Sequence, residues 1–218
     1  MSFTQVSKNL TKILSVMLIA VCLFIGCEEK KLPAHNDTQN GSKENISFTE
    51  TQEQTDFVKM EMMDGGIVII ELYPDIAPIT VENFKKLVGK GFYNGLLFHR
   101  VIADFVIQTG DPTATGRGGS KETIKGEFGI NGFSNNLSHT AGVLSMARSS
   151  YDLDSASSQF FICHGDCSRS LDGKYAAFGK VIAGMDVVNK IATVMTDAYD
   201  KPVEDQQISS IKFVKIEK

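Results

Sequence analysis

Residues 97–119, LFHRVIADFVIQTGDPTATGRGG, form the most informative stretch of this sequence. Arg100 and Gln108 fall within two short apolar runs that have the length of strands. Because side chains alternate faces along a strand, Arg100 faces away from its neighbours His99 and Val101. A guanidinium beside phenylalanines suits a ligand that is part apolar and part amide. The stretch therefore predicts a binding cleft built on strands.

Working outward, further short motifs follow in order along the chain. They are 98–102 (FHRVI), 105–108 (FVIQ), 110–111 (GD), 118–119 (GG), 145–147 (SMA), 158–162 (SQFFI), 171–174 (LDGK), 178–181 (FGKV) and Gly184. In composition, order and spacing they resemble the cyclophilin family of peptidyl-prolyl cis-trans isomerases. Several ordered blocks are far more specific than one short motif, and the resemblance covers roughly residues 56–218.

The pattern of elements predicts a mainly β fold. Residues 57–62 and 67–72 flank Asp64-Gly65-Gly66, a hairpin signal, and a helix is predicted from an N-cap at Thr80 to about Gly89. Many short strands separated by turns fit a barrel or a sandwich equally well. The family resemblance implies the barrel, a closed eight-stranded antiparallel one that is capped by two helices. Further strands are predicted at 105–109, 143–147, 159–163, 176–181 and 208–216. A second helix is predicted at 185–192.

The resemblance also implies a site. Arg100 corresponds to the catalytic arginine of the family, although alone it would be taken for a surface arginine in a salt bridge. The apolar pocket for the proline ring would consist of Phe105, Val106, Phe161 and Leu171. Polar or wall positions of the same cleft would be Gln108, Ala147, Arg148, Gln159 and Tyr175.

Some of these side chains also fit a structural role. Phenylalanine on a strand is most often core, and Phe160 is expected to be core because it points away from Phe161. Gln159 could brace the long glycine-rich loop 110–138, which is expected to run near the cleft. His99 is expected to be structural, because rotation about a proline bond needs no proton transfer to a side chain. Ser145 and two other serines, at 157 and 158, lack a recognisable nucleophile motif.

The implied reaction needs no cofactor and no metal. Ser170 stands where many family members have a tryptophan that is associated with cyclosporin binding, and this chain has no tryptophan. Weak cyclosporin affinity is therefore expected. Cys163 and Cys167 are predicted to be free or partly buried thiols rather than a disulfide, and the histidines lack zinc-ligand spacing with them.

The N-terminus has the features of an export signal. Lys8 and Lys12 precede an apolar run that is too short to span a bilayer comfortably. The run ends at Gly26-Cys27, which resembles the lipobox of bacterial lipoproteins, with Phe24 in place of the usual leucine. Residues 1–26 are therefore predicted to be a lipoprotein signal and Cys27 the lipidation site. A plain secretory signal with an incidental cysteine is the alternative.

Residues 27–55 are predicted to be the lipidated cysteine and a flexible polar tether, because this segment has few apolar residues. Loss of residues 1–26 moves the formal net charge from −4 to −6, because the segment carries Lys8, Lys12 and no acid. That charge excludes nucleic acid as the expected partner. The domain at 56–218 is expected to be monomeric and held at the outer side of a bacterial cell envelope.

Three functions fit these observations. The first is an exported, lipid-anchored prolyl isomerase that acts on proline-containing peptides and unfolded exported proteins. The second is a module that holds proline-containing segments with incidental turnover, and the third is a surface lipoprotein that acts through an exposed face. The arginine aimed at the prolyl nitrogen favours the enzyme, because mere binding does not require it.

Overall fold

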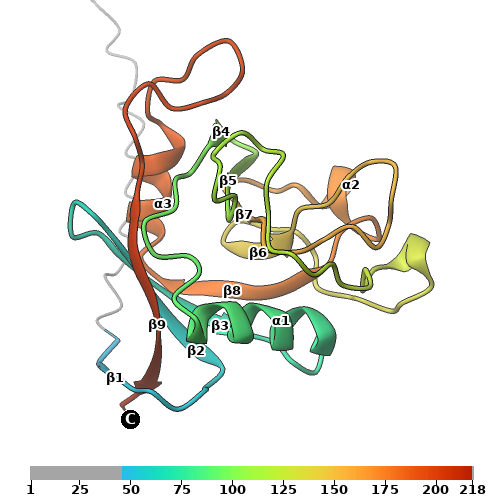
Figure 1. Ribbon diagram of the computed structural model, residues 1–218, viewed down its shortest axis with the longest axis horizontal. Coiled ribbons are helices and arrows are strands. Elements are labelled where there is room, and N and C mark those ends of the chain that lie inside the picture. The colour runs from blue at the N-terminus through green and yellow to red at the C-terminus, as the bar shows by residue number, and fades with distance from the viewer. Residues whose placement is uncertain (1–45, 218) are drawn as a thin grey trace, which may run out of the picture. The chain divides into compact units, whose positions relative to one another are not determined.

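The computed structural model describes residues 46–217, and nine strands occupy most of their regular structure. The strands are β1 (Phe48–Glu50), β2 (Phe57–Met62), β3 (Ile67–Leu72), β4 (Arg100–Ile102), β5 (Val106–Thr109), β6 (Val143–Met146), β7 (Phe160–Cys163), β8 (Ala177–Ala183) and β9 (Ile208–Ile216). The helices are α1 (Pro78–Gly89), α2 (Ser168–Leu171), α3 (Met185–Ala192) and the 3-10 helix η1 (Gly129–Asn131). Figure 1 shows α1 along the lower side of the strands and α3 at their upper left.

All strand pairs are antiparallel, and the spatial order is β1-β9-β2-β3-β8-β6-β7-β5-β4. The mainly β class and the hairpin of β2 and β3 are thus confirmed. Gly65 has a φ of 85° in the turn of that hairpin, as the glycine pair predicted.

The barrel differs from the predicted one in how it is closed. Within the described residues no ladder of paired strands joins β4 to β9. A bridge between Leu97 and Gln207 and the backbone hydrogen bond from Phe98 N to Gln206 O (2.9 Å) connect the two ends instead. The predicted eight-stranded barrel thus corresponds to β2 to β9, whose end strands β4 and β9 are joined by these two contacts rather than by a ladder, and β1 adds a ninth strand beside β9.

The ninth strand comes from the segment that was predicted to be a tether up to residue 55. Phe48, Thr49 and Glu50 pair with the last residues of β9, and Lys59 of β2 makes an ion pair with Glu50. A polar segment can be ordered in this way because β9 supplies the backbone partners that the segment cannot supply itself. Ordered structure therefore begins earlier than the predicted boundary.

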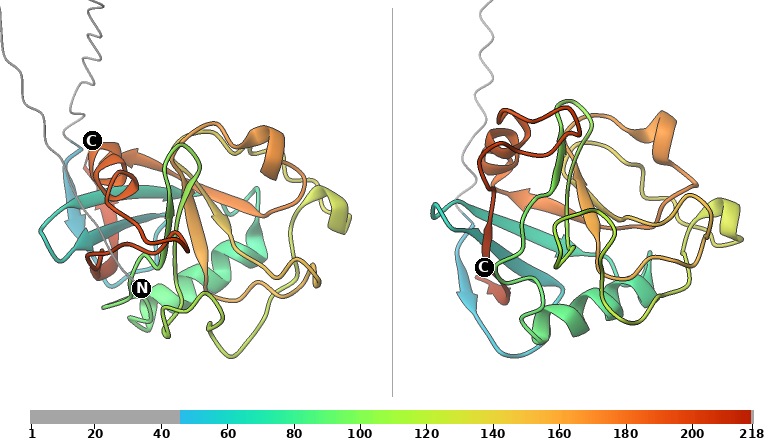
Figure 2. Two further views of the ribbon diagram at one scale, coloured as in Figure 1. Left: turned by 90° about the horizontal axis from the view of Figure 1, so that it is seen from above. Right: turned by 45° about the horizontal axis from the view of Figure 1, so that its top comes forward.

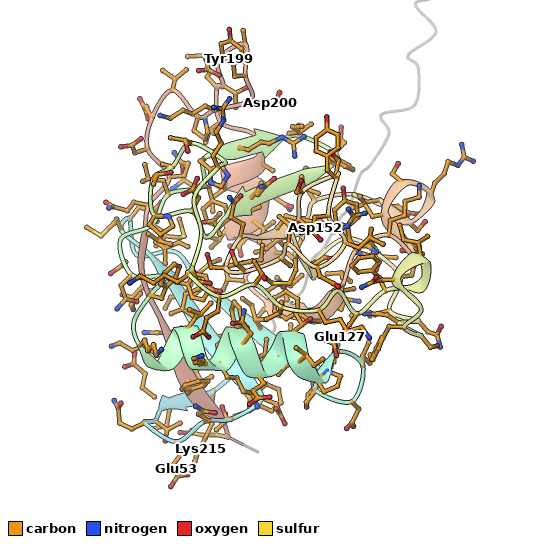
Figure 3. The ribbon with its side chains drawn as sticks, turned by 45° about the vertical axis from the view of Figure 1, so that its right-hand side comes forward. Glu53, Glu127, Asp152, Tyr199, Asp200 and Lys215 are labelled. Carbon is orange, nitrogen blue, oxygen red and sulfur yellow. The ribbon has the colours of Figure 1, made fainter. Side chains whose placement is uncertain are left out.

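The predicted start of α1 is also corrected. Thr80 is not the N-cap, because the helix already begins at Pro78, whose missing N–H suits the first helical position. The backbone amides at this end have no partner within the helix, and Glu127 satisfies them. Its carboxylate accepts from Ile79 N (3.0 Å), Thr80 N (2.8 Å) and Thr80 Oγ1 (2.7 Å). Figure 3 shows Glu127 next to the end of α1.

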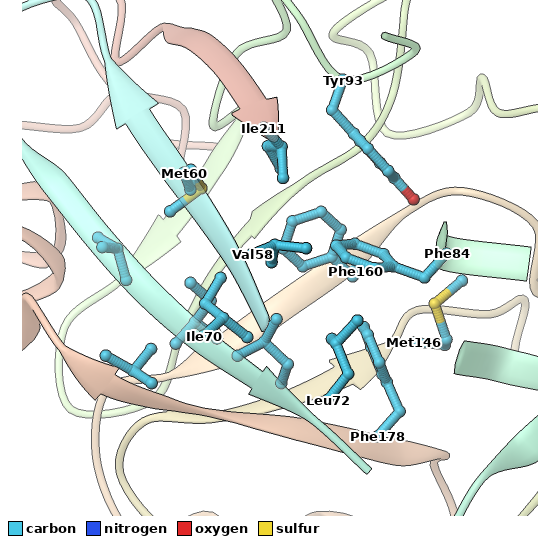
Figure 4. Packing of buried hydrophobic residues seen from close by; sticks show 14 of the residues in the cluster. Val58, Met60, Ile70, Leu72, Phe84, Tyr93, Met146, Phe160, Phe178 and Ile211 are labelled. Atoms are coloured by element: carbon cyan, nitrogen blue, oxygen red, sulfur yellow. The ribbon is translucent and has the colours of Figure 1, made fainter. Parts of the chain in front are cut away.

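The main core lies between the sheet and the two longer helices. Phe84 of α1 meets Tyr93, Phe160 and Phe178 with ring centroids 5.1–5.4 Å apart, and Figure 4 shows these rings together with residues of β2, β3 and β9. Phe160 is fully buried, as predicted. The predicted strands and the helix at 185–192 agree with β5 to β9 and α3 within one or two residues.

Cys163 and Cys167 are free and buried, in agreement with the prediction. The signal, Cys27 and most of the predicted tether lie outside the described residues. None of the described helices has the length and apolar character needed to cross a membrane.

Candidate active site

Three of the predicted site residues lie directly opposite one another on adjacent strands. Arg100 of β4 pairs with Gln108 of β5, and Gln108 pairs with Phe161 of β7. Paired positions on adjacent strands present their side chains to the same face. The fold therefore places a cation, an amide and an aromatic ring in one row.

Arg100 is held at both sides of its guanidinium. Its Nη1 donates to Gln108 Oε1 (3.2 Å), and its Nε lies 3.7 Å from Asp200 Oδ2. The side chain keeps 38% of its surface exposed. Arg100 thus does take part in a surface ion pair, yet it remains open to a ligand. No sequence pattern marks Asp200, which comes from a loop 100 residues further along and lies at the same end of the molecule as β4 and β5 (Figure 3).

The two glutamines continue the polar row. Gln108 Nε2 donates to Gln159 Oε1 (2.9 Å), and Gln159 Nε2 donates to Gly118 O (2.7 Å). Gln159 therefore braces the long loop, as one of the two sequence interpretations held, and it also orients Gln108. The chain of hydrogen bonds fixes the amide of Gln108 and, through it, the arginine.

The long loop is held in shape by Asp111, which is 1% exposed. Its carboxylate accepts from the backbone amides of Thr113 (2.7 Å), Thr115 (3.0 Å) and Gly118 (3.1 Å). Burial alone would raise the pKa of Asp111, but these donors and the Thr113 hydroxyl outweigh it and lower the pKa to about 2. The loop beside the cleft therefore contains a permanent buried anion at neutral pH.

The predicted apolar wall is a second hydrophobic cluster, separate from the main core. Its buried members are Val106, Val143, Phe161, Cys163, Cys167, Leu171 and Ala177, with Phe105, Leu137, Ala147 and Tyr175 packed against them and partly open. All the apolar site residues taken from the resemblance fall in this cluster, as does Tyr175. Phe161 contacts Tyr175 edge-on at 5.8 Å between centroids. Such a partly open apolar cluster suits a small ring such as that of proline.

Arg148 lies between two aromatic rings. Its guanidinium carbon is 4.9 Å from the Tyr175 centroid and 5.1 Å from that of Phe128. Its Nε donates to Lys174 O (3.0 Å) and its Nη1 to Ser149 O (2.8 Å). Arg148 therefore fixes the ring of Tyr175 at the edge of the cleft.

Ser145 has the histidine and carboxylate partners that were not expected from the sequence. His139 Nε2 lies 2.9 Å from Ser145 Oγ, and His139 Nδ1 lies 2.8 Å from Asp172 Oδ1. Ser145 is fully buried, however, so its hydroxyl cannot reach a substrate. The group has a structural position instead, because His139 stacks on Phe161 with centroids 6.2 Å apart. Burial lowers the pKa of His139 although Asp172 favours the proton.

His99 is buried beneath the long loop that Asp111 holds, close to Gly116. Neither of its ring nitrogens has a hydrogen-bond partner among the described residues. Burial lowers the pKa of His99, so the ring is neutral at neutral pH. Ser170 is exposed on α2, next to Leu171 of the second cluster. In Figures 1 and 2, α2 and η1 lie next to each other at one end, where Ile130 N donates to Gly173 O (2.8 Å).

The fold and this site define a small β-rich protein in which a guanidinium and two amides lie beside a partly open apolar cluster. The model of the cyclophilin type peptidyl-prolyl cis-trans isomerase/CLD family matches residues 57–213. The chain therefore belongs to the cyclophilin-type peptidyl-prolyl cis-trans isomerase family.

Relatives and solved structures agree with this assignment. The peptidyl-prolyl cis-trans isomerase ppi1 of Schizosaccharomyces pombe is 45% identical over 144 residues, which are 66% of this chain and 90% of the relative. The human peptidyl-prolyl cis-trans isomerase-like 1 is 44% identical, over 66% of this chain and 84% of its own. A Cryptosporidium parvum cyclophilin type isomerase, crystallised in the presence of the dipeptide ala-pro, has a TM-score of 0.65 and 32% identity, over 72% of this chain and 97% of that chain.

Proposed function

We propose that this chain catalyses cis-trans rotation of Xaa-Pro peptide bonds with Arg100 as the catalytic residue. The observation that carries the proposal is the row formed by Arg100, Gln108 and Phe161 on three adjacent strands. It sets a hydrogen-bond donor beside an apolar wall, which matches the nitrogen and the ring of proline. Family membership and the 45% identity to a named isomerase support the same reaction.

Rotation about the amide bond faces a barrier of about 20 kcal/mol, because the nitrogen lone pair is conjugated with the carbonyl. No covalent bond breaks, so the protein has only to bind the twisted state better than either planar isomer. In the twisted state the prolyl nitrogen becomes pyramidal and accepts a hydrogen bond. A guanidinium donates such a bond at any working pH, because it stays protonated.

The neighbours of Arg100 determine how well it can do this. Gln108 and Asp200 restrict the guanidinium from two sides, so little reorganisation is needed when the twisted bond forms. Phe161 and the partly open residues around it hold the proline ring, which contributes about 1–2 kcal/mol of binding. The substrate backbone can pass over Ala147, whose side chain is small.

Exchange NMR on a short Xaa-Pro peptide tests the proposal. The full chain in detergent is compared with Arg100→Ala and with the control Arg169→Ala, which removes an exposed arginine on α2. We expect the Arg100 variant to lose about a hundredfold in kcat/KM, as when one transition-state donor is removed. The control should keep its rate. A folded chain without acceleration would favour the peptide-binding module.

We further propose that the enzyme is exported and held at the membrane by lipid on Cys27, where it acts on unfolded exported proteins. The support lies in the sequence, where a short apolar run ends at Gly26-Cys27 and a polar segment follows. Several acyl chains would anchor the protein durably, because each buried methylene adds about 0.8 kcal/mol. Palmitate labelling tests this: it should disappear in Cys27→Ala, and persistent labelling would reject the site.

The enzyme is proposed to act as a monomer, because every residue of the site comes from one chain. Sedimentation of the protein in detergent, alone and with a proline peptide, measures this directly. A dimer that dissociates with loss of activity would contradict it.

A further inference from the structure

A cavity adjoins the row of polar side chains formed by Arg100, Gln108 and Gln159. It has a volume of about 580 Å³, and four of the predicted cleft residues line it: Gln108, Ala147, Arg148 and Gln159. Its far walls are the loop segment 116–120 and residues of the loop between β6 and β7. An extended peptide rises about 3.3 Å per residue, so a chain whose proline occupies the apolar wall passes this cavity within a few residues.

The lining of this cavity is unusual for a chain with a net charge of −4. It includes Arg117 and Arg148, five serines and two glutamines, but no aspartate or glutamate. Guanidinium, hydroxyl and amide groups are the donors that proteins use for carboxylate and phosphate groups. The cavity thus offers many donors and no anion.

Neither arginine of the cavity is neutralised by a protein carboxylate. Within residues 46–217 none of the ion pairs involves Arg117 or Arg148, whereas Arg100 is paired with Asp200. Arg148 donates two hydrogen bonds to carbonyls, which leaves guanidinium N–H groups free, and two aromatic rings hold it in place. The positive charge of Arg148 is therefore fixed and available, and the exposed Arg117 adds a second one.

The carboxylates of the adjoining loop segments have partners of their own, among them Asp152, which accepts from Asp154 N (2.9 Å). Asp111 is enclosed by its own loop, and Glu122 forms an ion pair with Lys86. Asp154 accepts from Gly126 N and from the Asn131 side chain. None of these groups lines the cavity, so an incoming anion would meet no competing side chain there.

We propose that this cavity selects substrates that carry an anionic side chain within three residues of the proline. The proposal rests on the isomerase function and names its substrate class. The shared chemistry is a carboxylate or phosphate bound by Arg117 and Arg148. Arg148 also holds Tyr175, so it couples the cavity to the wall that contacts the proline ring.

The test uses exchange NMR to measure how fast the full chain, in detergent, isomerises matched substrate peptides. Each pair carries Glu or Gln at one position, two or three residues before or after the proline, and a third set carries phosphoserine. We expect kcat/KM to be about threefold to fivefold higher for one Glu position than for its Gln partner, the range of a solvent-exposed charge pair. The preference should shrink from low to high salt.

Arg117→Gln should reduce the Glu-to-Gln ratio towards one, whereas the control Arg169→Gln should keep it. Arg148→Lys retains a charge but loses the planar group that stacks on Tyr175, and it should lower the ratio and the rate together. A preference for phosphoserine alone would support the phosphate form of the proposal. Equal rates for Glu, Gln and phosphoserine at every position would overturn it, as would a ratio that survives both substitutions. Absence of turnover on every peptide would instead contradict the isomerase function.

Discussion

Phe160 and Phe161 are neighbours on β7, yet they belong to two different regions of the molecule. Phe160 is fully buried among Phe84, Tyr93 and Phe178 in the main core. Phe161 belongs to the second cluster, which includes both buried and partly open side chains, and it contacts Tyr175 and His139. One strand thus faces the main core with one side and the candidate site with the other.

The difference lies in what surrounds each ring. The core rings pack mainly against apolar side chains, and the one hydroxyl among them, that of Tyr93, donates to Ser158 O (3.2 Å), so they gain free energy chiefly by burial. The cleft region combines apolar side chains with fixed polar groups, the Arg100 row on one side and the His139 group on the other. The cleft keeps its shape when empty because hydrogen bonds hold it, and its partly open side chains remain available to a proline ring.

The largest expected effect separates the two faces of β7. Phe160→Ala should lower the free energy of unfolding by about 3–5 kcal/mol, because it leaves a dry cavity in the core. Phe161→Ala should cost less stability, because water and ligand can fill the space at the cleft, and should reduce kcat/KM strongly. Urea unfolding and exchange NMR on both variants measure this. Equal stability losses with unchanged rates would show that the cleft is only a second core.

Acid should weaken the cleft region before the core. The pKa of Asp111 is about 2 in the folded protein and about 3.8 when unfolded, so the unfolded state takes up the proton first as the pH falls. The stabilisation is complete above pH 4 and is lost towards pH 2, by about 2 kcal/mol. Unfolding curves from pH 6 to 2 measure the loss. Asp111→Asn should be less stable at neutral pH and should not show this loss of stability at low pH. If the variant loses the same stability between pH 4 and pH 2, other carboxylates cause the loss.

At the core side, Glu127→Gln should lower the free energy of unfolding by about 1–3 kcal/mol. The amide keeps one acceptor oxygen, so one of the α1 donors at Ile79 or Thr80 is left without a partner in a buried place. Glu122→Gln is the matched control, because its carboxylate forms an exposed ion pair with Lys86. Thermal unfolding should separate the two variants, and similar stabilities would refute the capping role of Glu127.

The smallest expected effect concerns Ser170, which stands where many family members have a tryptophan. Ser170→Trp adds an aromatic surface beside Leu171 and should tighten cyclosporin inhibition about tenfold, the effect of one added aromatic contact. The turnover of a short proline peptide should stay nearly the same, because Arg100 and Phe161 are untouched. Inhibition curves for both proteins check this. Tight inhibition of the unmodified enzyme would show that the tryptophan is not needed.

Local patterns in the sequence determined much of this protein. The glycine pair at 65–66 predicted the hairpin, and strand alternation correctly separated Phe160 from Phe161. The ordered motifs predicted the family, and they pointed to side chains that the fold brings together. These features depend on neighbours in the chain, so the amino-acid order alone specifies them.

Only the tertiary structure decided which distant groups complete those features. Glu127 caps a helix that begins 49 residues earlier, and Asp200 and Asp172 reach Arg100 and His139 from other loops. Residues 48–50 became a strand because β9 offered an unpaired edge, not because of their own composition. Partners that come together through folding leave no local periodicity or spacing, so they become visible only when the sheet has brought them together.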